Sequence, residues 1–187
     1  TALAALFFAA GSLPMSRAPS MLAPNAPQQT LVAGHREPFR KASYWIHPLA
    51  DFSVEARVLA RRDYDRDREA EIAPVDLTLG WGRMSDSAVL DDVRISLSDR
   101  WWHWYSPNLP IPIEEINRSA ANMHIVPAND YVRRQLDQVR AGHVVTLRGY
   151  LVEARGAHGY AWRSSLTRGD VGEGSCEIVW VEQLTVR

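Results

Sequence analysis

The residues best suited to chemistry are concentrated in one polar segment near the end of the chain. Positions 162–177 read WRSSLTRGDVGEGSCE, in which glycines separate hydroxyl, thiol and charged side chains. Arg168 and Asp170 are two residues apart, so in an extended segment they face the same side and can pair. Glycines permit a positive φ, which lets backbone N–H groups converge on an anion. The segment predicts a ligand-binding loop in which Arg168 and Asp170 contact the ligand. The alternative is a hairpin whose polar groups satisfy its own backbone.

A nucleophilic catalytic set can be assembled from this segment and one upstream histidine. His124 combined with Asp170, and with Ser165 or Cys176 as the nucleophile, would complete such a set. The surrounding spacing matches no phosphate loop, Gly-x-Ser-x-Gly elbow or His-Glu-x-x-His motif. The competing interpretation is a histidine hydrogen-bonded at the rim of a barrel and a buried, unreactive Cys176. The histidine spacings match no zinc pattern, so neither a metal site nor a cofactor is predicted.

A run of aromatic residues, Trp-Trp-His-Trp-Tyr at 101–105, forms a second candidate site. In a strand, Trp102 and Trp104 share one face, and the first and third residues of the run share the other. If one face joins the core, the other leaves large rings near the surface as a stacking platform for sugars or bases. Trp102 and Trp104 are therefore candidate ligand-binding residues. The alternative is that the proline-rich segment 107–112 folds over the rings.

Strands must position these residues, because alternation of apolar and polar side chains dominates the sequence from about residue 40 onward. The alternating or continuous apolar stretches lie at 53–61, 77–81, 93–97, 143–153 and 177–186. About seven to nine short strands are indicated in total.

One helix is also indicated, and it begins near Asn129. It has an acidic first turn and a basic last turn, as the helix dipole favours, and Gly142 is well placed just beyond its end. Its apolar stripe consists of Val132, Leu136 and Val139. Many strands with one late helix predict a mainly β fold, a small, partly open β-barrel that is OB-like and has one principal α-helix plugging one end. A β-sandwich is the alternative.

Composition restricts the classes of function. The chain has 187 residues, a net charge of −1, 46% hydrophobic residues and a single cysteine. A disulfide framework and an all-cysteine metal site are excluded. A near-neutral chain has no overall field that would recruit nucleic acid or anionic lipid.

The N-terminal region differs in composition from the rest. Residues 1–11 are apolar, which suggests a signal-peptide or membrane-anchor remnant, although the stretch is short for a membrane span. Residues 12–39 are rich in proline and alanine and predict a poorly ordered linker, and residues 40–187 form the β-rich domain. This organisation suggests a domain in the periplasm, either exported or anchored in the inner membrane through the N-terminal segment.

Several segments together resemble an uncharacterised family of small exported or membrane-anchored bacterial proteins. The matching residues are Pro-Val-Asp-Leu at 74–77 leading to Trp81-Gly82, Asn-Met-His at 122–124 with Pro127-Ala128, Gly-Tyr-Leu-Val at 149–152, and the segment 162–177. The resemblance covers most of the chain after Tyr44. It implies an N-terminal anchor and an extracytoplasmic domain, and it implies no activity.

Three functions are compatible with these features. The first is a non-enzymatic binding or assembly module of the bacterial envelope, whose partner is an envelope protein or a glycan. The second is a hydrolase that uses His124, Asp170 and either Ser165 or Cys176. The third is an oligonucleotide-binding barrel, which the near-neutral charge disfavours.

Overall fold

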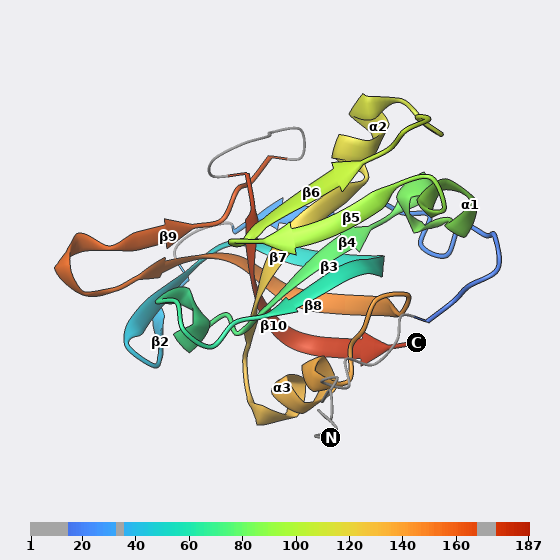
Figure 1. The fold of residues 1–187 in the computed structure, drawn as a ribbon. Helices are drawn as coiled ribbons and strands as arrows, with labels where there is room; N and C mark the ends of the chain where they lie inside the picture. The colour runs from blue at the N-terminus through green and yellow to red at the C-terminus, as the bar shows by residue number, and fades with distance from the viewer. Residues whose placement is uncertain (1–14, 33–35, 168–174) are drawn as a thin grey trace, which may run out of the picture.

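The main feature of the computed structural model, which describes residues 15–32, 36–167 and 175–187, is one strongly curved sheet (Figure 1). Its strands are β1 (Gln28–Leu31), β2 (Phe39–Lys41), β3 (Tyr44–Asp63), β4 (Val75–Gly80), β7 (Ala120–Pro127), β8 (Val144–Arg155), β9 (Ala161–Arg163) and β10 (Glu177–Val186). The strand order is β1–β3–β4–β7–β10–β8–β9, and β2 also pairs with β3.

The sheet closes on itself because β3 pairs with both β4 and β8. The ring is therefore β3–β4–β7–β10–β8, with antiparallel neighbours except for the parallel pair β7 and β10. The first part of β3 pairs with β8 and its last part with β4, and register shifts near Pro48 and Val58 interrupt its regular pairing. The expected small, partly open β-barrel is confirmed.

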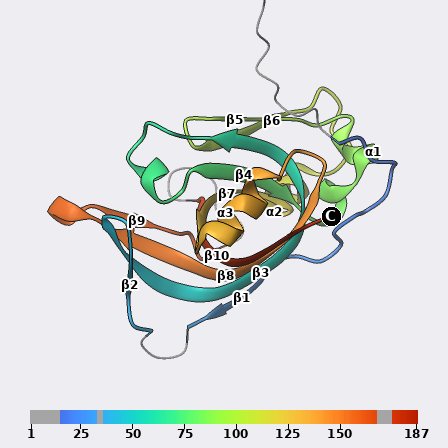
Figure 2. The ribbon, with the colours of Figure 1, turned by 90° about the horizontal axis from the view of Figure 1, so that it is seen from below.

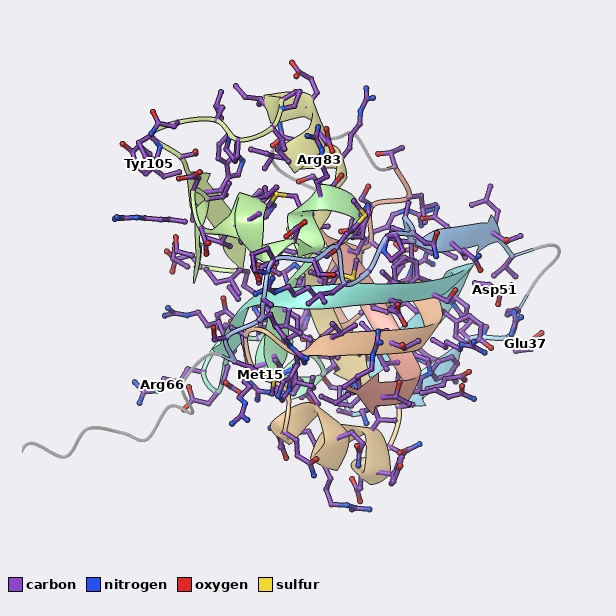
Figure 3. The ribbon with its side chains drawn as sticks, turned by 90° about the vertical axis from the view of Figure 1, so that its right-hand side faces the viewer. Met15, Glu37, Asp51, Arg66, Arg83 and Tyr105 are labelled. Carbon is purple, nitrogen blue, oxygen red and sulfur yellow. The ribbon has the colours of Figure 1, made fainter. Side chains whose placement is uncertain are left out.

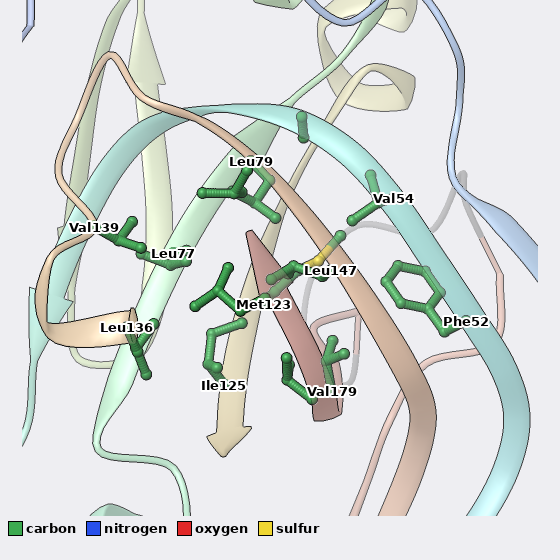
Figure 4. Packing of buried hydrophobic residues seen from close by; sticks show 14 of the residues in the cluster. Phe52, Val54, Leu77, Leu79, Met123, Ile125, Leu136, Val139, Leu147 and Val179 are labelled. Atoms are coloured by element: carbon green, nitrogen blue, oxygen red, sulfur yellow. The ribbon is translucent and has the colours of Figure 1, made fainter. Parts of the chain in front are cut away.

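The barrel interior contains the side chains that alternation assigned to it, and Figure 4 shows them meeting between the strands. The largest fully buried members of this cluster are Leu77, Leu79, Met123, Ile125, Leu136, Leu147 and Leu151. The run in β10 is apolar at consecutive positions because this strand is buried on both faces: Val179 and Val181 belong to the barrel core, whereas Ile178 and Trp180 belong to an outer cluster.

The helix α3 (Asp130–Asp137) lies across one end of the barrel (Figure 2). The Asn129 side chain caps it by accepting a hydrogen bond from the Val132 N–H at 3.0 Å, as the sequence predicts. The apolar stripe is buried in the barrel core. The helix ends earlier than expected, so Gly142, with a φ of +91°, follows a separate turn and is not the residue just after the helix.

A large insertion between β4 and β7 covers one flank of the barrel. It contains α1 (Ser87–Leu90), the hairpin of β5 (Arg94–Ser98) and β6 (Trp101–Tyr105), and α2 (Ile113–Arg118), preceded by the 3₁₀ turn η2 (Gly82–Ser85). Two further 3₁₀ turns are η1 (Glu69–Glu71) and η3 (Ala157–Gly159). The insertion has its own apolar cluster, against which Trp102 and Trp104 pack.

The N-terminal strap, residues 15–31, differs from the linker expected over residues 12–39. Its backbone has fixed partners: the Met15 N–H donates to the Ala141 carbonyl at 2.9 Å, and the Ala23 N–H donates to the Ser85 hydroxyl at 3.0 Å. Ala23 is only 1% exposed. Figure 3 shows Met15 near the barrel end that α3 covers. The folded unit therefore extends N-terminally past residue 40 to Met15.

Residues 1–11, expected to be a leader or anchor, lie outside the described residues. No helix in the described ranges combines the length and apolarity required to cross a bilayer.

Candidate ligand-binding cleft

A buried polar cluster lies on the outer face of β4 and β7. Asp76 in β4 and His124 in β7 are paired directly across the two strands. Their neighbours Leu77 and Met123 point into the barrel, so alternation directs Asp76 and His124 outward. The β5–β6 hairpin and the segment around β9 cover this face, and the two side chains are only 0% and 3% exposed.

Asp76 is held by donors from three side chains. Its Oδ1 lies 2.8 Å from Nδ1 of His124 and 2.9 Å from Nη1 of Arg100, and its Oδ2 lies 3.3 Å from Nδ2 of Asn122. A carboxylate paired with a guanidinium acts as an acceptor, so Nδ1 of His124 donates to it. This fixes the imidazole ring and directs Nε2 away from Asp76.

Arg100 joins the hairpin to the barrel. Its guanidinium donates to both oxygens of Asp67 at 2.6 and 2.9 Å and to the Ala73 carbonyl at 2.9 Å, and it lies 3.9 Å from the centroid of the Tyr64 ring. Burial alone would lower the pKa of Arg100, but the hydrogen bonds to Asp67 and the charges of Asp76 and Asp67 raise it above its ordinary value. The guanidinium is therefore a charged group with two compensating carboxylates.

Aromatic rings form the walls beside these polar groups. The Trp162 ring lies 4.7 Å from the His124 ring and 5.8 Å from the Arg100 guanidinium, measured to its centroid. Glu69 in η1 also lines this space and accepts a hydrogen bond from the Tyr160 hydroxyl. Burial and then this contact with Glu69 raise the pKa of Tyr160.

These groups surround a cleft of about 450 Å³, which we call the His124 cleft. It is lined by Glu69, Arg100, Trp101, His124, Trp162, Arg163 and Cys176. Polar side chains with hydrogen-bond partners and two indole rings therefore surround a space large enough for a small ligand.

A second space of about 240 Å³ lies beside it and is called the tryptophan pocket. Its aromatic lining is Trp81, Trp101, Trp102, His103 and Trp104. Asn117 and Asn122 contribute amide groups, and Trp101 and Cys176 line both spaces. The two spaces are thus adjacent.

The structure brings together part of the proposed catalytic set. His124 and Cys176 line the same cleft, and Asp76, which sequence reasoning missed, is the carboxylate at Nδ1 of His124. The Ser165 hydroxyl accepts a hydrogen bond from the Thr167 N–H at 3.1 Å, as expected for a hydroxyl that satisfies a local turn. The other two loop candidates, Arg168 and Asp170, lie outside the described residues.

The proposed stacking residues Trp102 and Trp104 are half-buried and line the tryptophan pocket. Nε1 of Trp104 donates to Oδ1 of Asn117 at 3.3 Å. Sequence reasoning did not assign Trp101 or Arg100 to a site, although Trp101, which is 36% exposed, borders both spaces. A signal for Asp76 was present, since it is the one charged residue in the strand Val75–Gly80.

In the described part of the chain, no group of three or more histidine, cysteine and carboxylate side chains is arranged to hold a metal ion. Comparison with known proteins finds no matching family model, no matching curated protein and no matching solved structure.

Proposed function

We propose that this protein is a non-enzymatic binding module of the bacterial envelope that holds an uncharged glycan in the His124 cleft. The observation that carries this proposal is the pairing of two indole rings, Trp101 and Trp162, with polar groups that other side chains hold in place. Aromatic rings stack on the apolar faces of sugars, while imidazole and carboxylate groups bind their hydroxyls. Fold analogy is consistent with this, because OB-type barrels bind oligosaccharides on their second and third strands and on nearby loops. In this barrel the second and third strands of the ring are β4 and β7.

The charges around the cleft favour an uncharged ligand over a nucleic acid. Arg100 is compensated by Asp67 and Asp76, and Arg163 is paired with Glu153 at 3.0 Å. Binding of a phosphate backbone depends on cations that neutralise the phosphates. The cations that line this cleft already have carboxylate partners, so we place the oligonucleotide hypothesis second to the glycan.

The test is binding of an uncharged β-1,4-linked N-acetylglucosamine tetramer, measured by titration calorimetry. We expect Trp162→Ala to weaken binding by about tenfold or more, in keeping with the loss of one stacked ring. Trp162→Phe keeps a ring over His124 and should therefore lose less affinity than Trp162→Ala. The control is Trp45→Ala, because Trp45 is an exposed indole that lines neither the His124 cleft nor the tryptophan pocket.

Two results would contradict the glycan proposal. One is no binding of this tetramer or of other uncharged oligosaccharides by the wild-type protein. The other is equal weakening by Trp162→Ala and Trp45→Ala. Salt-sensitive binding of a single-stranded oligonucleotide at the cleft would favour the third hypothesis instead.

The location at the envelope is supported by the apolar composition of residues 1–11 and by the resemblance described above. We expect the full chain to fractionate with the periplasm or the inner membrane and to be accessible to protease added to spheroplasts. Cytosolic fractionation of the full chain would contradict this part of the proposal.

The Asp76–His124 hydrogen bond favours one second candidate, a hydrolase. The Cys176 thiol and an imidazole oriented by Asp76 line the same cleft, so they supply the residue types of a nucleophile and a general base. Hydrolysis of an activated ester that His124→Asn and Cys176→Ser both abolish would support the hydrolase. Turnover that neither substitution changes, or no turnover, would contradict it.

A further inference from the structure

We infer that the His124 cleft and the tryptophan pocket are neighbouring subsites of one groove that binds a linear oligosaccharide. This inference rests on the proposed function and specifies its ligand as a chain of sugars and not a single sugar.

The two spaces share a boundary and follow the same strand. Trp101 and Cys176 line both, while His124 lines one and Asn122 lines the other. His124 and Asn122 are two residues apart on β7, so they face the same side at a separation of about 6.6 Å. This spacing is of the order of one hexose unit, so consecutive sugars can occupy consecutive subsites.

The two subsites differ in chemistry. The His124 cleft contains an imidazole, a guanidinium and the Glu69 carboxylate, which suits a sugar bound by its hydroxyls. The tryptophan pocket has four indole rings, twice as many as the cleft, beside small and polar side chains that include Glu177. The amide of Asn117 in its lining is oriented by the hydrogen bond from Trp104. Indole rings with amide groups suit an N-acetylated sugar that stacks through its C–H face. Because the two subsites differ in chemistry, they distinguish between positions along an oligosaccharide, which a uniform aromatic patch would not do.

One anchor positions both subsites. Arg100 contacts Asp76 of the Asp76–His124 pair and is the residue immediately before β6, which supplies three of the four tryptophans of the second subsite. A further hydrogen bond, from Arg62 to the Leu97 carbonyl at 3.3 Å, holds the hairpin against β3. The subsites are therefore held at a fixed separation before the ligand arrives, which lowers the entropy cost of binding.

The experiment compares N-acetylglucosamine oligomers of one to four units with the wild type and with Trp104→Phe. We expect wild-type affinity to rise on the order of tenfold or more once the oligomer spans both subsites. Trp104→Phe keeps an apolar ring against the cluster beneath the hairpin but removes the indole N–H. Because the tryptophan pocket is the subsite for an N-acetylated sugar, Trp104→Phe should weaken binding of every length several-fold. Trp162→Ala, in the same experiment, should weaken only the oligomers that are long enough to reach the His124 cleft.

The matched control is Tyr105→Ala, because Tyr105 is on the same strand, is 62% exposed and points away from the barrel (Figure 3). It should leave every affinity unchanged. Affinity that is independent of length, or equal weakening of all lengths by Trp162→Ala, would overturn the two-subsite groove while leaving glycan binding intact. Failure of every oligomer to bind would instead contradict the proposed function.

Discussion

Arg100 combines an unfavourable backbone conformation with several favourable side-chain contacts. Asp99 and Arg100 form the two-residue connection between β5 and β6, with φ values of +50° and +68°. Hairpin turns of this kind favour glycine or asparagine, and a left-handed conformation at another residue costs about 1 kcal/mol. The arginine remains compatible with the fold because its guanidinium binds Asp67, Asp76 and the Ala73 carbonyl. Strain of this type is concentrated at functional sites in many proteins.

Glycine substitutions can separate the backbone strain of this turn from the side-chain contacts of Arg100. Arg100→Gly removes the strain and also the guanidinium, and it leaves the buried Asp76 without its cation. We expect a net loss of stability of about 2 kcal/mol or more, measured by urea denaturation. The control Asp99→Gly changes the neighbouring turn position, where hairpin turns accept aspartate, and should change stability by less than about 1 kcal/mol. Equal changes in stability for the two variants would show that the Arg100 side chain contributes little to stability.

At the scale of elements, the N-terminal strap is held where it passes the turn after α3. Gly142 in this turn has a φ of +91°, and a Cβ added there would lie 2.1 Å from the Met15 carbonyl oxygen. Arg17 also donates to the Gly142 carbonyl at 3.2 Å and to the Arg187 carbonyl at 3.0 Å. The strap therefore depends on glycine at this position both for backbone conformation and for close approach.

A comparison of two glycines isolates the contribution of the strap. Gly142→Ala and Gly159→Ala both place alanine at a positive φ, but an added Cβ at Gly159 meets nothing within 4 Å. Backbone strain should lower the free energy of unfolding of each variant by about 1 kcal/mol. Gly142→Ala should be destabilised substantially further, because Met15 must move. Hydrogen exchange should show faster exchange of the strap amides in Gly142→Ala only. Equal losses and unchanged exchange would contradict a packed strap.

For the molecule as a whole, ion pairs connect the segments that surround the cleft. Asp67 binds Arg100, while Glu153 pairs with Arg155 at 3.1 Å and Arg163 at 3.0 Å. Burial alone would raise the pKa of both carboxyl groups, but hydrogen bonds to these arginines and their charges lower it below the ordinary value. The folded protein therefore binds protons at these groups less readily than the unfolded chain does.

This difference predicts a loss of stability in acid. Because the folded-state pKa values are lowered, the stabilisation is fully present above the unfolded value of about 4 and is lost as the pH falls through the folded values. We expect the thermal midpoint to fall between about pH 5 and pH 2, with a shallower fall in Glu153→Gln. Glu55→Gln, which removes an exposed carboxylate, is the control. A Glu153→Gln profile parallel to that of the wild type would contradict this assignment.

The sequence by itself determined the elements whose signal is local. Alternation of apolar and polar residues indicated the strands that form the barrel, and the stripe with its Asn129 cap indicated α3. His124 lies between the apolar Met123 and Ile125, so alternation also placed it on the opposite face of its strand, away from the barrel core. These features depend on residues close together in the chain, so a short window contains the information.

Only the tertiary structure decided which strands are neighbours and which side chains meet. Asp76 and His124 are 48 residues apart, and the contact between the strap and Ser85 spans 62 residues. A periodic pattern shows which face of a strand is apolar, but the partner and the register depend on packing over the whole barrel. This is why the sequence did not reveal that Asp76 is the carboxylate bonded to His124.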